Sequence, residues 1–171
     1  MLNSNQFKMN VVKGFVDAST PNRLLTAKIA DTEQATLVAG QCVKIADINS
    51  KVLPLLGSTK ETDDHAGVLV FTTHRNEYKA NQNVEFAPLG SGVIVVLEAN
   101  GAIANGAKVY FAPTGAKVTS TGTIAIGHAY NKATADGDLI RVILDVRESI
   151  SDVSTDEGNG SSNESEGGTD E

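Results

Sequence analysis

The sequence predicts an all-β fold: a single compact β-barrel or sandwich of short antiparallel strands, with an extended N-terminal arm and a disordered acidic C-terminal tail. Short segments alternate apolar and polar residues, turn residues separate these segments, and one turn-then-strand phrase occurs three times. We therefore divide the chain into an arm or first strand at 1–22, a β-domain at 23–150 and a tail at 151–171.

The repeated phrase begins with a small polar turn and continues as an alternating strand. Its copies are AGQCVKIA at 39–46, ANQNVEFA at 80–87 and ANGAKVYFA at 104–112. Each turn contains Gly or Asn, which tolerate left-handed backbone angles. Each strand is expected to direct two apolar side chains to one face, namely Val43 and Ile45, Val84 and Phe86, and Val109 and Phe111. The same alternation places Cys42 on the outward side of its strand.

Ten strand candidates follow one another between the arm and the tail. In chain order they are LLTAKIA (24–30), QCVKIADI (41–48), KVLPLL (51–56), GVLVFTT (67–73), VEFA (84–87), GVIVVLEA (92–99), AKVYFA (107–112), KVTS (117–120), GTIAIGHA (122–129) and LIRVILDV (139–146). Turn dipeptides such as Asn100-Gly101 and Asp136-Gly137 separate them. Pro54 places its strand at an edge or a bulge, because proline has no N–H to donate to the ladder. The segment 92–99 is apolar on both faces, as expected of a central strand or of an edge covered by another subunit.

The two ends of the chain differ in composition. Four apolar residues of the arm are odd-numbered and would share one face of an extended segment: Phe7, Met9, Val11 and Phe15. Such an arm can add a strand to a partner's sheet edge, although these residues could equally form the first strand of the domain's own core. The tail holds seven acidic and no basic residues among Ser, Gly and Asn, which predicts disorder.

Composition and motifs argue against several functions. Without the tail, the body has 14 acidic and 14 basic residues, and a neutral body argues against nucleic-acid binding. No apolar segment is long enough to span a membrane. A single cysteine cannot form an intramolecular disulfide, which favours synthesis in a reducing compartment. We find no nucleotide-binding or nucleophile motif and no zinc-type spacing of histidines and cysteine, so we expect no catalytic residues, no metal site and no cofactor. An enzyme that uses two carboxylates stays open as an alternative.

The order of these motifs resembles a known family over about residues 66–147. The segments are GVLVFTTHRNEYKANQNVEFAPLGSGVIVVLEANGAIANGAKVYFAPTGAKV (67–118) and GTIAIGHAYNKATADGDLIRVIL (122–144). The closing hairpin, Asp136-Gly137-Asp138 followed by alternating Ile140, Val142, Leu144 and Val146, carries the resemblance furthest. Together these features are similar to the capsid cement or decoration proteins of tailed bacteriophages.

This resemblance implies a non-enzymatic virion protein, made in the bacterial host cytoplasm, that binds the outer surface of an assembled head. Its expected partners are the major capsid protein, at the junctions between its subunits, and neighbouring copies of itself in a homo-oligomer, with no role for nucleic acid or membrane. The expected partner-binding residues are those four of the arm, together with Val93, Val95 and Leu97. The alternative is a carbohydrate- or host-receptor-binding β-module on the virion surface, for which the available aromatic side chains are Tyr78, Tyr110 and Tyr130.

Overall fold

A computed structural model describes residues 12–17, 23–47, 53–60, 63–72, 75–113 and 115–147. Within these ranges every regular element is a β-strand, which confirms the all-β prediction. The strands are β1 (Leu25–Ile29), β2 (Leu37–Val38), β3 (Cys42–Asp47), β4 (Leu55–Ser58), β5 (Gly67–Leu69), β6 (Glu77–Tyr78), β7 (Asn83–Pro88), β8 (Ile94–Glu98), β9 (Lys108–Phe111), β10 (Val118–Thr119), β11 (Ala125–Ala129) and β12 (Leu139–Ile143).

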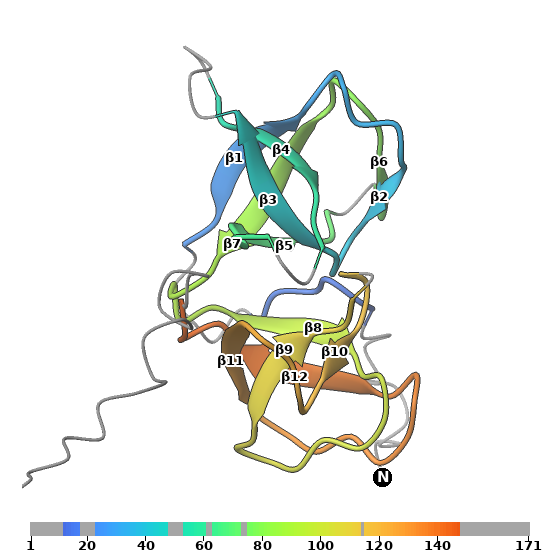
Figure 1. The fold of residues 1–171 in the computed structure, drawn as a ribbon, viewed down its shortest axis with the longest axis vertical. Coiled ribbons are helices and arrows are strands. Elements are labelled where there is room, and N and C mark those ends of the chain that lie inside the picture. The colour runs from blue at the N-terminus through green and yellow to red at the C-terminus, as the bar shows by residue number, and fades with distance from the viewer. Residues whose placement is uncertain are drawn as a thin grey trace, which may run out of the picture.

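Five strands of the N-terminal half form a closed barrel, which we call the first barrel (Figure 1). Their order is β1-β4-β3-β5-β7, and β1 closes the ring by pairing in parallel with β4 and antiparallel with β7. The short strands β2 and β6 pair with each other beside it. Side chains from alternate strand positions fill its interior, namely Ala27, Ile29, Val43, Leu56, Leu69, Val84 and Phe86.

Five strands of the C-terminal half form a second sheet, in the order β10-β9-β11-β12-β8. A parallel bridge between Ala99 and Val118 joins its two edge strands, so we call this sheet the second barrel. In Figure 1 it lies below the first barrel. Its interior is again built from alternate positions, namely Leu97, Ala99, Val109, Val118, Ala129, Ile140 and Val142.

The two barrels have the same strand order and strand directions. Strands β8, β9, β10, β11 and β12 take the places of β1, β3, β4, β5 and β7. The parallel pair Ile29–Leu56 of the first barrel corresponds to the parallel pair Ala99–Val118 of the second, and the other neighbouring strands pair antiparallel in both. The body is therefore a duplicated unit, and strand positions in one barrel can be compared with positions in the other.

Two glycines at corresponding positions support this duplication. Gly67 of β5 and Gly127 of β11 each lie against the backbone of the next strand. A Cβ atom would collide with the carbonyl oxygen of Ala87 in the first case and of Ile143 in the second. Both barrels thus bring two strands together more closely than any side chain would allow at that position.

The repeated turn is a real structural unit. Gly40, Asn81 and Gly106 have φ angles of 76°, 67° and 75°, which confirms the predicted left-handed turns. The N–H of each donates to a neighbouring strand, at 2.7, 3.0 and 2.8 Å, and the accepting carbonyls belong to Leu69, Ile29 and Ala129, respectively. A fourth copy, unnoticed in the sequence repeat, lies at Gly137, whose N–H donates to the carbonyl of Ala99 at 2.9 Å. Each barrel therefore contains two such turns, at corresponding places.

The barrels meet in a packed contact that we call the seam. Strand alternation directs Val43 and Leu69 into the first barrel, whereas Cys42, Val68 and Ala87 point out of it and join the core of the second barrel. Cys42 is on the opposite face from Val43, as predicted, but it is fully buried because the second barrel covers that face.

One inward prediction is wrong. Ile45 was expected beside Val43 in the core, but its side chain is 43 % exposed. The pairing register of β3 with β4 shifts between Ile45 and Asp47, and such a bulge breaks the regular alternation. Strand β4 begins directly after Pro54, so no hydrogen bond of the strand ladder needs the N–H that proline lacks.

Candidate functional site

The N-terminal segment at residues 12–17, which we call the strap, lies along the edge of β8. The N–H of Gly14 donates to the carbonyl of Val96 at 2.7 Å, and the N–H of Val96 donates to the carbonyl of Phe15 at 2.8 Å. The strap therefore adds a short antiparallel strand to β8. We expected this segment to be either a central strand or an edge covered by another subunit, and along this stretch of β8 the chain's own strap supplies the cover.

Side chains of the strap continue the contact on both sides of the edge. Val16 packs onto the core of the second barrel. Lys13 forms an ion pair with Glu98 at 3.6 Å, and Asp17 forms one with Arg141 at 3.4 Å. The strap thus presents an apolar residue between a basic and an acidic one, and β8 and β12 present the complementary charges.

Glu98 lies at the centre of a small charge cluster. Its carboxylate also meets Lys117 at 2.9 Å, and Lys117 in turn meets Asp136 at 2.9 Å. The hydrogen bond from Lys117, with support from Lys13, keeps the pKa of Glu98 below its usual value. Because these groups are partly exposed, each pair contributes only modestly to the free energy of unfolding.

The strap also contacts the first barrel. The N–H of Phe71 donates to the carbonyl of Gly14 at 2.8 Å. On the side of the second barrel, the Lys13 ammonium donates to the carbonyl of Ala116, between β9 and β10. A shallow hollow of about 200 Å³ lies between the strap and the β2–β6 pair, with Val12 and Glu77 among its walls. The strap therefore links the edge of the second barrel to the first barrel.

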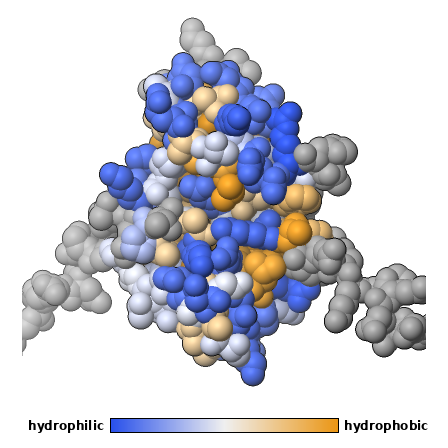
Figure 2. Space-filling model, turned by 90° about the vertical axis from the view of Figure 1, so that its right-hand side faces the viewer, coloured by the Kyte–Doolittle hydropathy of each residue, from blue (hydrophilic) through white to orange (hydrophobic). Residues whose placement is uncertain are grey.

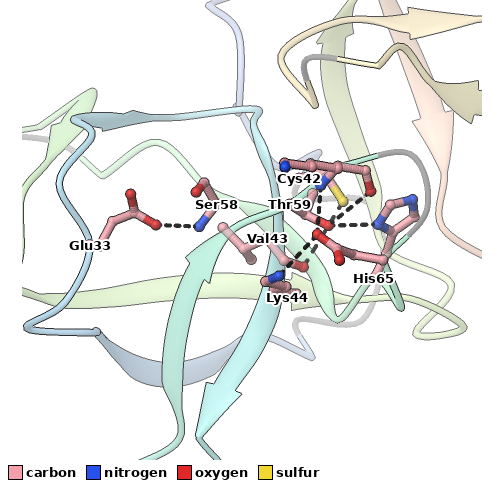
Figure 3. A network of polar contacts seen from close by, with 9 residues as sticks. Glu33, Cys42, Val43, Lys44, Ser58, Thr59 and His65 are labelled. Atoms are coloured by element: carbon pink, nitrogen blue, oxygen red, sulfur yellow. Dashed lines mark hydrogen bonds and ion pairs between the residues drawn. The ribbon is translucent and has the colours of Figure 1, made fainter.

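A buried polar contact lies in the seam (Figure 3). The hydroxyl of Thr59 and Nδ1 of His65 are 3.1 Å apart, and the His65 ring meets the Phe111 ring edge-on with centroids 5.5 Å apart. The backbone N–H of Cys42 donates to the carbonyl of Gly115 at 2.8 Å. Burial raises the pKa of the Cys42 thiol well above its usual value, so this thiol is expected to be unreactive.

Each barrel has a hollow at the corresponding place. A hollow of about 330 Å³ on the first barrel is lined by Thr26, Thr72, Arg75, Tyr78, Asn83, Val84 and Glu85. A smaller one of about 150 Å³ on the second barrel is lined by Val96, Asn131, Leu139, Ile140 and Arg141. Thr26 corresponds to Val96 and Glu85 to Arg141, so the duplication extends from the strands to the outer surface.

The structure places the expected partner-binding residues in different environments. Phe7, Met9 and Val11 lie outside the described residues. Phe15 is half-buried in the strap. The side chains of Val93, Val95 and Leu97 are fully buried in the chain's own core, and their contact with a partner stays a prediction.

The sequence analysis did not predict a role for the charged residues of the strap and its partners. Lys13 and Asp17 flank the apolar pair Phe15 and Val16, and this spacing of charges was the available signal. Their partners Glu98 and Arg141 lie on distant strands, so only the fold brings the four together.

The face drawn in Figure 2 is largely polar. Figure 2 shows a face on which hydrophilic residues predominate and hydrophobic ones form small groups near the middle. Among the described residues, no group of three or more His, Cys, Asp or Glu side chains could hold a metal ion. The part of the chain that the structure describes has no helix long and apolar enough to cross a membrane.

Comparisons with known proteins identify a family and a similar solved structure. A solved structure of the head fiber gp8.5 N base in bacteriophage phi29 is similar, with a TM-score of 0.49 and 15 % sequence identity over 71 % of this chain and 93 % of that one. No curated protein sequence matches. The family model of the XM1 gp53 minor capsid protein matches residues 2–144, which is most of the chain. The chain belongs to the XM1 gp53 minor capsid protein family and is a phage capsid-associated structural protein.

Proposed function

We propose that this protein binds the outer surface of an assembled phage head and cements the junctions between major capsid protein subunits. The observation that carries the proposal is membership of a minor capsid protein family over residues 2–144. A protein that binds the intact lattice, and not its separated subunits, stabilises that lattice by mass action. Many copies on one head make a modest affinity for each copy sufficient, and in this role the protein catalyses no reaction.

The architecture supports this role. Two barrels of one topology share a packed seam, and the strap crosses from one to the other. A body of this kind resists deformation, which a clamp across a junction requires. The arm residues Phe7, Met9 and Val11 precede the strap and are proposed to reach a neighbouring subunit, either the major capsid protein or another copy of this chain.

The test uses heads purified without this protein. Adding back the full chain should raise the temperature at which the heads release DNA, and the effect should saturate when the binding sites are full. Heads that bind the protein without any change in DNA release would contradict cementing. Heads that do not bind it would contradict the whole proposal.

A deletion tests the arm separately. Because residues 12–17 belong to the fold, the deletion should remove only residues 1–11. We expect a body that unfolds at the same temperature as the full chain but binds heads more weakly. A deleted protein that binds heads as well as the full chain would show that the arm is not a docking element.

A further inference from the structure

The duplication allows the two sheet edges to be compared position by position. Val96 of β8 directs its N–H and C=O to the strap. The corresponding residue of β1 is Thr26, which lies opposite Glu85 as Val96 lies opposite Arg141. Because alternate residues of an antiparallel strand bond to opposite sides, the N–H and C=O of Thr26 point away from β7.

Among the described residues, no strand pairs with this edge of β1 at Thr26. Pairing of β1 with β4 covers Lys28 and Ile29 only, and none of the described residues bonds to the outward side of Thr26. Exposure agrees, since Leu25 is 52 % exposed whereas the corresponding Val95 is fully buried. We call this site, from Leu24 to Thr26, the open edge; β1 lies on the left of the first barrel in Figure 1.

The charges beside the open edge are the reverse of those beside the strap. The strap places Lys13 on Glu98 and Asp17 on Arg141. In the pairing registers of the two barrels, Lys28 of the first barrel corresponds to Glu98 of the second. In the same way, Glu85 corresponds to Arg141. A strand that fits the open edge would therefore carry an acidic residue where the strap has lysine and a basic one where the strap has aspartate.

Neither Lys28 nor Glu85 has an ion-pair partner among the described residues. Arg75 lines the same hollow as Glu85, but the ion pairs of the described residues include neither of them. Within the described part of the chain, these two charges lack ion-pair partners and lie beside a strand edge that takes no strand, as a docking strand of complementary charge requires.

We propose that the open edge of β1 binds an extended segment of another virion protein, antiparallel to β1, with the pattern acidic–x–x–apolar–basic. The apolar residue would cover Leu25 as Val16 covers Val95. The basic residue would reach Glu85 and the acidic one Lys28. The binding site is inferred from the fold alone. That the bound segment belongs to another virion protein rests on the proposed function.

Residues 1–11 and 148–171 of this chain fit the open edge less well. Residues 1–11 contain one lysine and no acidic residue, and residues 148–171 contain acidic residues but no Lys or Arg. Neither of these two segments of a second copy therefore supplies both charges. A segment from a different protein, such as the shell protein, can supply both.

Two synthetic peptides test the proposal on the full chain labelled with ¹⁵N. The first has the sequence of residues 10–18, NVVKGFVDA, and the second exchanges its charges, NVVEGFVKA. We expect the second peptide to shift the backbone amide signals of Leu25 and Thr26 and to bind roughly tenfold more tightly than the first, because two partly exposed ion pairs replace two repulsions. Equal affinities, or no shift at Thr26 with either peptide, would overturn the proposal.

A charge-reversed protein provides the matched control. Lys28→Glu with Glu85→Arg copies the charges of Glu98 and Arg141 onto the first barrel. This variant should prefer the natural peptide by a similar factor, and an unchanged preference would overturn the charge assignment. If the double variant folds poorly, Glu85→Arg alone replaces it, because this substitution alters one exposed side chain. The single variant should lose most of the original preference for the charge-exchanged peptide. Because peptide binding needs no heads, its failure is distinguishable from a failure of cementing, which the DNA-release assay measures.

Discussion

The first and second barrels have corresponding strands in the same order, but they differ in whether one sheet edge is covered by another segment of the chain. In the second barrel the strap covers the edge of β8, and Val96 is 1 % exposed. In the first barrel the corresponding edge at Thr26 is exposed and takes no strand from the described residues. An open strand edge is normally blocked, because it can pair with another chain. The comparison supports our proposal that the first barrel receives a partner at this edge.

The largest expected effect comes from placing the same charge at corresponding positions of the two barrels. Val95→Asp would bury an unpaired carboxylate in the core and should cost about 4 kcal/mol of unfolding free energy or prevent folding. Leu25→Asp changes a half-exposed side chain and should cost less than about 1 kcal/mol in the isolated protein. Urea unfolding of both variants measures the difference. Similar losses in the two variants would mean that the edges are not in different environments.

The paired glycines provide the next test of the duplication. Gly67→Ala and Gly127→Ala should each cost about 3 kcal/mol, because a Cβ collides with the backbone of the next strand in both barrels. Gly57→Ala is the control, since its nearest neighbours lie at 3.4 and 3.5 Å, and it should cost less than about 1 kcal/mol. Urea unfolding checks all three. If one of the two paired glycines tolerates alanine, the barrels differ in strand spacing at that position.

A smaller effect is expected from acid, at the charge cluster that holds the strap. The folded-state pKa of Glu98 lies below its usual value of 4.5, mainly because Lys117 donates to it. The stability that Glu98 contributes is therefore present above about pH 4.5 and is lost as the pH falls through the folded pKa. Glu98→Gln should lower stability at neutral pH and flatten its loss on acidification.

The same pH series on Glu85→Gln is the control for this prediction. Glu85 is the exposed carboxylate beside the open edge, and it has no ion-pair partner among the described residues. Its replacement should leave the unfolding free energy and its acid dependence close to those of the unaltered protein. If Glu98→Gln behaves in the same way as Glu85→Gln, the cluster does not stabilise the strap.

Much of the fold could be predicted from local patterns in the sequence. Alternation at Val84 and Phe86, and the turn at Asn81, predict a strand and its start because both signals act over a few residues. The strands β2 and β6 were missed because each has only two residues, too few for alternation to appear. The equally short β10 was predicted within the longer candidate at 117–120. Ile45 was misplaced because a bulge depends on the register with β4, which no local pattern reveals.

The candidate site was less predictable than the fold. The sequence analysis predicted a partner contact at Val95, which stays a prediction, and did not predict that the strap, from residues about eighty positions earlier, pairs with it. The duplication was hidden because corresponding positions share burial more than identity, as Ile29 and Ala99 show. The open edge became visible only when β1 and β8 could be compared in three dimensions.

The most direct test of the account is hydrogen exchange at the Thr26 amide, in the free protein and on heads. In the free protein we expect fast exchange at Thr26 and slow exchange at Val96, whose N–H donates to Phe15. Lys28, which donates to the carbonyl of Pro54, should be protected in both states and serves as the control. On heads the Thr26 amide should become protected as well. Fast exchange at Thr26 in protein that is bound to heads would contradict docking at the open edge of the first barrel.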